Sequence, residues 1–139
     1  MPRYILDTDH ISLLLGGHQP TRDRVFQSLS DCQITVISVQ EVFNGWTGRL
    51  GSNNERIAVY ERLYITTQLF QRITIVNYDE VADQVYQQII QANSNLAKRR
   101  IENDIRIAAI ALANQATIVT RNYRDFNLVP GLQIEDWSL

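Results

Sequence analysis

The stretch ENDIRIAAIALANQATIVTRNYRDF, residues 102–126, decides the fold class of this 139-residue chain. In its first half, Ile, Leu and Ala recur at three- and four-residue spacing and fill most of the remaining positions, which is typical of a helix buried on nearly all sides. The run 117–120 is short and β-branched, as buried strands are. A buried helix that leads directly into a buried strand predicts an α/β fold. The polar segment 121–126 then lies at the carboxyl end of that strand, where open α/β sheets bind ligands.

The same alternation continues over the rest of the chain. Further strands are predicted at 4–6, 34–37, 73–76 and 132–134, and further helices at 11–15, 20–29, 39–46, 57–70 and 79–92. Strands that alternate with helices predict a mostly parallel sheet of four or five strands, covered on both faces as an α/β/α sandwich. Residues 93–100 are interpreted as a polar linker. The sequence contains no repeat or low-complexity tract, so residues 1–139 are expected to form one domain.

Composition limits the compartment and the chemistry. The single cysteine, Cys32, excludes an internal disulfide and is expected in the core. No apolar run approaches membrane-spanning length, and residues 1–3 lead directly into the first strand, so neither a membrane span nor a signal peptide is expected. A cytoplasmic protein is the simplest interpretation. His10 and His18 are too few for a zinc site and are interpreted as ordinary loop residues.

Basic residues cluster locally although the net charge is only −2. Such a cluster can bind phosphate groups even when the total charge is slightly acidic, and the alternative is a charged face exposed to solvent. The candidate phosphate-binding side chains are Lys98, Arg99, Arg100, Arg121 and Arg124.

Four acidic residues follow or begin predicted elements at one edge of the sheet: Asp7, Glu41, Asp104 and Asp125. Carboxylates brought together in this way repel one another, and a hard divalent cation relieves the repulsion. Local alternatives exist. Ser38 and Glu41 have capping-box spacing, Asn103 is a predicted helix cap, and Asp125 could form a surface ion pair with Arg121 or Arg124.

These residues together resemble PIN-domain proteins of the VapC type. The resemblance rests on ILDTDH with Asp7, SVQEVFNGW with Glu41, ENDIRIAAIA with Asp104, IVTRNYRDF, and the ending PGLQIEDWSL, and it covers essentially the whole chain. The family's three main acids correspond to Asp7, Glu41 and Asp104. Two positions depart from the family pattern: Glu102 is a rival for the third acid, and the fourth acid is either Asp125 or Asn122.

The resemblance implies a Mg²⁺- or Mn²⁺-dependent endoribonuclease that cleaves structured RNA such as transfer or ribosomal RNA by in-line attack. Thr120 and Asn122 would orient the carboxylates, and whether one or two metal ions bind is left open. The resemblance also implies a homodimer and a small antitoxin partner. An apolar approach to the acids is predicted at Trp46, Tyr60 and Tyr64, with core or dimer contacts as the alternative.

Two other functions are compatible with parts of the sequence. Asp7-Thr8-Asp9 after a strand resembles the nucleophile pair of haloacid-dehalogenase phosphatases, but His10-Ile11-Ser12 follows it, and the only lysine, Lys98, lies in the predicted linker. A catalytically idle PIN-like module that binds RNA or protein is the second alternative. A metal titration combined with a nuclease assay separates all three functions.

Overall fold

The computed structural model describes residues 2–51 and 54–139 and contains a five-stranded, fully parallel sheet. The strands are β1 (Tyr4–Leu6), β2 (Cys32–Thr35), β3 (Thr74–Val76), β4 (Thr117–Val119) and β5 (Ile134–Glu135). The helices are α1 (Thr8–Leu15), α2 (Gln19–Gln27), α3 (Val36–Thr47), α4 (Arg56–Arg72), α5 (Glu80–Ala92), α6 (Glu102–Ala113) and α7 (Tyr123–Phe126). The spatial order is β3-β2-β1-β4-β5, so the first strand is central. The predicted parallel α/β sandwich is confirmed.

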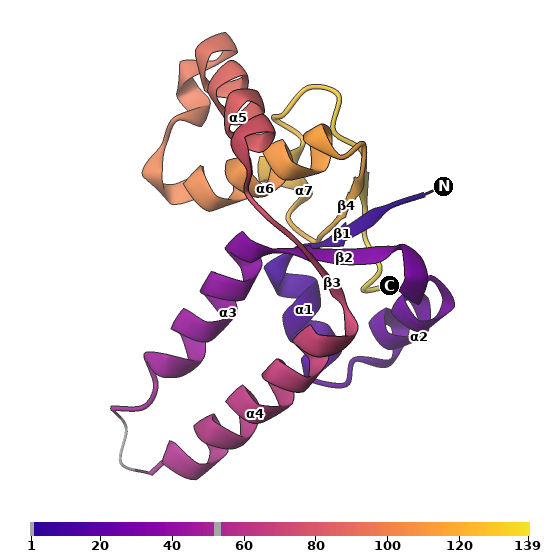
Figure 1. The fold of residues 1–139 in the computed structure, drawn as a ribbon, viewed down its shortest axis with the longest axis vertical. Coiled ribbons are helices and arrows are strands. Elements are labelled where there is room, and N and C mark those ends of the chain that lie inside the picture. The colour runs from indigo at the N-terminus through magenta and orange to yellow at the C-terminus, as the bar shows by residue number, and fades with distance from the viewer. Residues whose placement is uncertain (1, 52–53) are drawn as a thin grey trace.

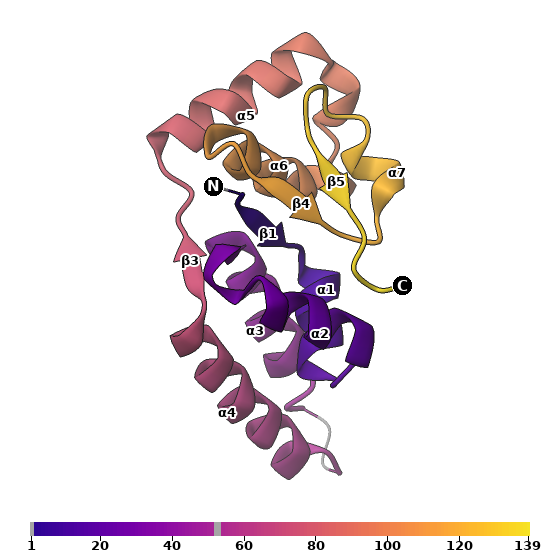
Figure 2. The same cartoon turned by 90° about the vertical axis from the view of Figure 1, so that its right-hand side faces the viewer.

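Two apolar cores lie on opposite faces of the sheet, and the alternation of side chains along each strand separates them. In β1, Ile5 belongs to the core under α5 and α6, whereas Leu6 belongs to the core under α1, α2 and α3. In β4, Ile118 and Val119 divide in the same way. Figure 2 shows the helices that cover these cores, with α5 and α6 on one side of the sheet and α1, α2 and α3 on the other. Helix α6 is buried along most of its length, as its composition predicts.

Helices α3 and α4 extend together away from the sheet as an arm (Figure 1). Between them lies a groove of about 590 Å³, and its walls include Thr8, Glu41, Gly45 and Trp46. None of the helices in the described part of the chain is long and apolar enough to cross a membrane.

The boundary between β2 and α3 differs from the prediction, because the helix begins at Val36 and not after Ser38. Thr35 caps this helix, since its hydroxyl accepts a hydrogen bond from Ser38 N at 3.1 Å. The alternative role of Glu41, in a capping box with Ser38, is therefore excluded, because Thr35 caps this helix. Asn103 does not cap α6 either, because the residue before that helix is Ile101 and no side chain caps it.

Two segments interpreted as loop have more structure than expected. His10 is fully buried within α1, which begins directly after Asp7. Residues 93–100 are not an unstructured linker. They contain the short 3₁₀ helix Ser94–Leu96 and the first residues of a second 3₁₀ helix, Arg99–Ile101. Leu96 and Ile101 anchor these turns in the core. His18, by contrast, precedes α2 as expected and hydrogen-bonds Thr21. Cys32 is buried, as predicted.

Candidate active site at the carboxyl edge of the sheet

Asp7 lies at the centre of the sheet edge because it follows the middle strand. Its backbone N–H donates to the Val119 carbonyl at 2.9 Å, which extends the β1–β4 pairing by one residue. Its carboxylate caps α1 by accepting from Thr8 N at 2.7 Å, and its other oxygen accepts from the Thr120 hydroxyl at 2.9 Å. The side chain is almost entirely buried.

Asn122 connects Asp104 and Asp125, two further acids of this edge. Its side-chain amide donates to Asp104 at 3.3 Å and to Asp125 at 3.1 Å. Its backbone N–H donates to the Thr120 hydroxyl oxygen at 2.9 Å, and this hydroxyl in turn donates to Asp7. The two polar residues that follow β4 therefore place Asp7, Asp104 and Asp125 in one hydrogen-bonded network.

Glu41 reaches the same edge from α3. One carboxylate oxygen accepts from the Thr8 hydroxyl at 2.7 Å, and the other lies 3.5 Å from the Asn103 side-chain amide. The Ser38 hydroxyl is 2.9 Å from the Thr8 hydroxyl oxygen. Because Thr8 has a single hydroxyl proton and donates it to Glu41, Ser38 is the donor in the second contact.

Thr8, Asp9 and Asn103 are site residues that the sequence interpretation missed. Asp9 accepts from the backbone N–H of Arg121 at 3.1 Å, and its carboxylate lies 3.5 Å from the Thr120 hydroxyl. Their positions in the sequence could have identified them, since Thr8 and Asp9 directly follow Asp7 and Asn103 directly precedes Asp104.

The electrostatics of Asp7 and Asp104 differ from those of Asp125. Burial, reinforced by the neighbouring Asp9 carboxylate, raises the pKa of Asp7 to about 7. Burial, together with Glu41 and the other acids, raises the pKa of Asp104 to about 6. The pKa of Asp125 is lowered, because Arg100 and then Asn122 hydrogen-bond its carboxylate. Asp7 and Asp104 are therefore held close to other carboxylates, and the Arg100 charge lowers the pKa of Asp104 by less than burial and those carboxylates raise it.

The donor chemistry of this edge fits a hard divalent cation. Within residues 2–51 and 54–139, no Lys or Arg forms an ion pair with Asp7, Glu41 or Asp104. All of their polar side-chain atoms are carboxylate oxygens, the ligands that Mg²⁺ and Mn²⁺ prefer. The same described residues contain no group of three His, Cys, Asp or Glu side chains close enough to hold a metal ion as they stand. The oxygen ligands therefore suit such an ion, although the carboxylates are spaced more widely than direct coordination requires.

The candidate basic residues fall into two groups. Arg99 and Arg100 line a polar pocket of about 330 Å³ together with Glu41 and Asp104. Arg100 also forms a forked contact with Asp125, with N–O distances of 3.3 and 3.4 Å.

Lys98, Arg121 and Arg124 are exposed. The Arg121 side chain lies 3.8 Å from Asp9, so it does not form the ion pair with Asp125 that was one alternative for that acid. In the structure Arg100 takes that place, because the turn at 99–101 brings it beside α7. The rival acid Glu102 forms an ion pair with Arg106 one turn along α6, and it also lines the polar pocket that contains Glu41 and Asp104.

The apolar approach to the acids is only partly as predicted. Trp46 lines the groove between α3 and α4, which reaches Glu41. Tyr60 and Tyr64 do not line it and are 60% and 64% exposed, because Val59 and Arg62 occupy the face of α4 that turns toward α3.

Comparison with known proteins gives a consistent result. Residues 4–132 match the family described as PIN domain. The chain is 29% identical over 139 residues to ribonuclease VapC2 of Haemophilus influenzae, and the match covers 99% of both chains. It is 26% identical over 141 residues to the tRNA(fMet)-specific endonuclease VapC of Salmonella typhimurium, again over 99% of both. The crystal structure of DNA-bound VapBC from Salmonella typhimurium superposes with a TM-score of 0.79 at 26% identity, covering 99% of each chain.

Proposed function

This chain belongs to the PIN-domain family, and from that premise we propose that it is a metal-dependent endoribonuclease, the toxin of a toxin–antitoxin pair. The observation that carries the proposal is the set of carboxylates around Asp7 and Asp104, whose pKa values are raised to about 7 and about 6 by burial and by neighbouring carboxylates. The two relatives described above, one named a ribonuclease and the other a tRNA(fMet)-specific endonuclease, match over 99% of their length and support the same activity. A phosphatase of the haloacid-dehalogenase kind has no support from these comparisons.

The proposed metal ligands are Asp7, Glu41 and Asp104, with Asp125 as the fourth acid, and Mg²⁺ or Mn²⁺ as the ion. A bound divalent cation supplies Lewis acidity and offsets negative charge on the phosphodiester. Thr120 and Asn122 hold Asp7, Asp104 and Asp125 in place through the hydrogen bonds described above. Glu41, whose carboxylate is oriented by Thr8, is suited to accept a proton from the attacking water.

The test of this function is cleavage of RNA by the purified chain over a titration of Mg²⁺ and of Mn²⁺. Activity that requires the ion and yields cut RNA supports the proposal. Binding of RNA without cleavage at any metal concentration would identify an idle PIN-like module instead, and release of inorganic phosphate alone would indicate a phosphatase.

The proposed substrate is structured RNA cut at an exposed single-stranded loop, which implies that the protein acts in the cytoplasm. Bases in a loop can enter a cleft, whereas duplex RNA hides its bases. Binding is expected to weaken about tenfold between about 50 and 200 mM salt if roughly two or three phosphates are contacted by Lys98, Arg99, Arg121 or Arg124. The measurement is RNA affinity against salt, together with cleavage of a hairpin and a perfect duplex of the same sequence. Equal cleavage of both substrates would contradict this prediction.

The fourth acid has two candidate positions, 122 and 125, and mutation separates them. Asp125→Asn is expected to raise the metal concentration for half-maximal cleavage and to lower the rate roughly tenfold, since it removes a carboxylate at the metal edge. Asn122→Ala is expected mainly to lower the rate, because its neutral amide orients Asp104 and Asp125. If Asp125→Asn leaves the metal dependence unchanged while Asn122→Asp tightens it, position 122 is the fourth site.

The proposed partner is a small antitoxin that inserts a segment into the groove between α3 and α4. Similarity to VapBC complexes supports such a partner. The groove suits an apolar anchor beside Trp46 and a basic side chain beside Glu41. We also propose a homodimer, as the family resemblance implies.

A further inference from the structure

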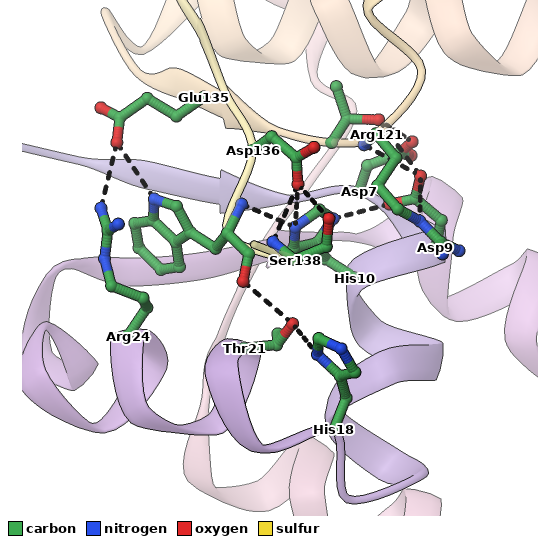
Figure 3. A network of polar contacts seen from close by, with 12 residues as sticks. Asp7, Asp9, His10, His18, Thr21, Arg24, Arg121, Glu135, Asp136 and Ser138 are labelled. Carbon is green, nitrogen blue, oxygen red and sulfur yellow. Dashed lines mark hydrogen bonds and ion pairs between the residues drawn. The ribbon is translucent and has the colours of Figure 1, made fainter.

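The buried His10 of α1 hydrogen-bonds the backbone of the C-terminal segment at Trp137 (Figure 3). After β5, the side chain of Trp137 is buried against Tyr4, with ring centroids 4.9 Å apart. The Trp137 carbonyl accepts from the Thr21 hydroxyl at 3.1 Å. Its backbone N–H donates to Nε2 of His10 at 3.0 Å. None of these contacts is used by the proposed reaction.

The partners of His10 determine which ring nitrogen carries the proton. A backbone N–H can only donate, so Nε2 of His10 is the acceptor and bears no proton. The proton is therefore on Nδ1, which donates to Asp9 Oδ1 at 2.8 Å. Asp136 Oδ1 also lies 3.5 Å from Nε2, and it already accepts from the backbone N–H and the hydroxyl of Ser138.

Asp9 connects His10 to the residues at the carboxyl edge of the sheet. Its second oxygen accepts from Arg121 N at 3.1 Å and lies 3.5 Å from the Thr120 hydroxyl. The backbone N–H of Thr120 donates to the Glu135 carbonyl at 2.8 Å. Residues 120–121, which include the Thr120 hydroxyl that donates to Asp7, are therefore held from two sides. On one side β5 bonds the Thr120 backbone, and on the other Asp9, itself bonded by His10, accepts from the Arg121 backbone.

We infer that His10 is a positioning residue for the proposed nuclease: the Trp137 amide fixes its tautomer, and its Nδ1–H orients Asp9 against residues 120–121. This inference rests on the proposed function for its catalytic consequence. The link from His10 through Asp9 to Arg121 is a property of the metal-free chain and can be measured separately.

The first experiment uses the wild-type chain without metal. Nitrogen-15 NMR of the imidazole is expected to show a protonated Nδ1 and an unprotonated Nε2 for His10. A protonated Nε2 would exclude the Trp137 contact and overturn the inference.

Two matched substitutions divide the role of His10. The Asn amide in His10→Asn occupies the position of Nδ1 and retains the donor to Asp9. The Gln amide in His10→Gln occupies the position of Nε2 and retains only the acceptor for Trp137. His10→Gln is expected to lower kcat about tenfold with little change in KM and to speed hydrogen exchange at the Arg121 amide, whereas His10→Asn retains both properties close to wild type.

Ser138→Ala is the control, because Ser138 contacts Asp136 and not the ring. It is expected to leave kcat and the exchange of the Arg121 amide unchanged. Equal kcat per folded molecule in both His10 variants, or equal exchange at Arg121, would mean that His10 only contributes packing and would overturn the inference. A wild-type chain that cuts no RNA would refute the proposed function, while the tautomer and the exchange rates would still decide the link to Asp9.

Discussion

Replacement of Asp7 by Asn is expected to abolish RNA cleavage and yet leave the metal-free protein at least as stable as wild type. Loss of a residue that merely orients metal ligands already costs about 10- to 100-fold in activity, so loss of a proposed ligand is expected to cost at least about 100-fold. The fold tolerates the change because the Asn carbonyl can accept from Thr8 N, and its amide can donate to the Thr120 hydroxyl oxygen.

The stability effect has a definite pH dependence. In the folded chain the pKa of Asp7 is about 7, against an ordinary value of 3.8, so the folded state holds a proton that the unfolded state has lost between these values. Stability of wild type therefore falls as pH rises from about 4 to about 7, by up to about 1.4 kcal/mol per pH unit from this group. Asp7→Asn removes this contribution, so the variant should match wild type near pH 4 and exceed it near pH 8.

The measurement is chemical denaturation of both proteins in chelator across this pH range, beside a cleavage assay with Mn²⁺. Asp23→Asn is a suitable control, because Asp23 is exposed on α2 and its side chain hydrogen-bonds only Gln19 within the described residues. A clear loss of metal-free stability in Asp7→Asn at pH 8 would mean that Asp7 is a structural residue.

Filling the groove between α3 and α4 at Gly45 is expected to weaken antitoxin binding strongly without unfolding the toxin. Gly45 is exposed within α3 and lines the groove, and, apart from its chain neighbours and the backbone of its own helix, no described atom lies within 4 Å of an added Cβ. Gly45→Trp should therefore occupy the space meant for the partner's anchor and weaken binding by at least about 30-fold, or about 2 kcal/mol. Gly45→Ala is the matched control and should stabilise the helix by about 0.5–1 kcal/mol while retaining the partner.

Binding is measured by co-expression with the product of any short open reading frame that adjoins the gene, followed by titration of the purified chains. Full affinity of Gly45→Trp would place the partner elsewhere on the surface. Absence of any second chain when the native operon is expressed would remove the support for an antitoxin.

The local sequence determined where helices and strands form and that the sheet is covered on both faces. The apolar residues of α6 and the β-branched run of β4 require burial on all sides, and only a parallel sheet covered by helices provides it. The same alternation placed Asp7 directly after a strand and Glu41 and Asp104 near the starts of predicted helices, and a parallel sheet brings these positions to one edge. Fold class and the neighbourhood of these acids were therefore predictable from pattern alone.

Only the tertiary structure decided how the polar side chains pair. The helix start at Val36 depends on Thr35, and β-branched Val36 and Ile37 had favoured a longer strand. The pairing of Arg100 with Asp125 and of His10 with Trp137 joins residues 25 and 127 positions apart. Hydrogen bonds act over about 3 Å between groups with no periodic spacing, so they become visible only after the chain has folded. Buried side chains recur at the helix or strand period, so their pattern can be recognised in the sequence. The partner of a polar side chain is set by distance in the folded structure and follows no such period.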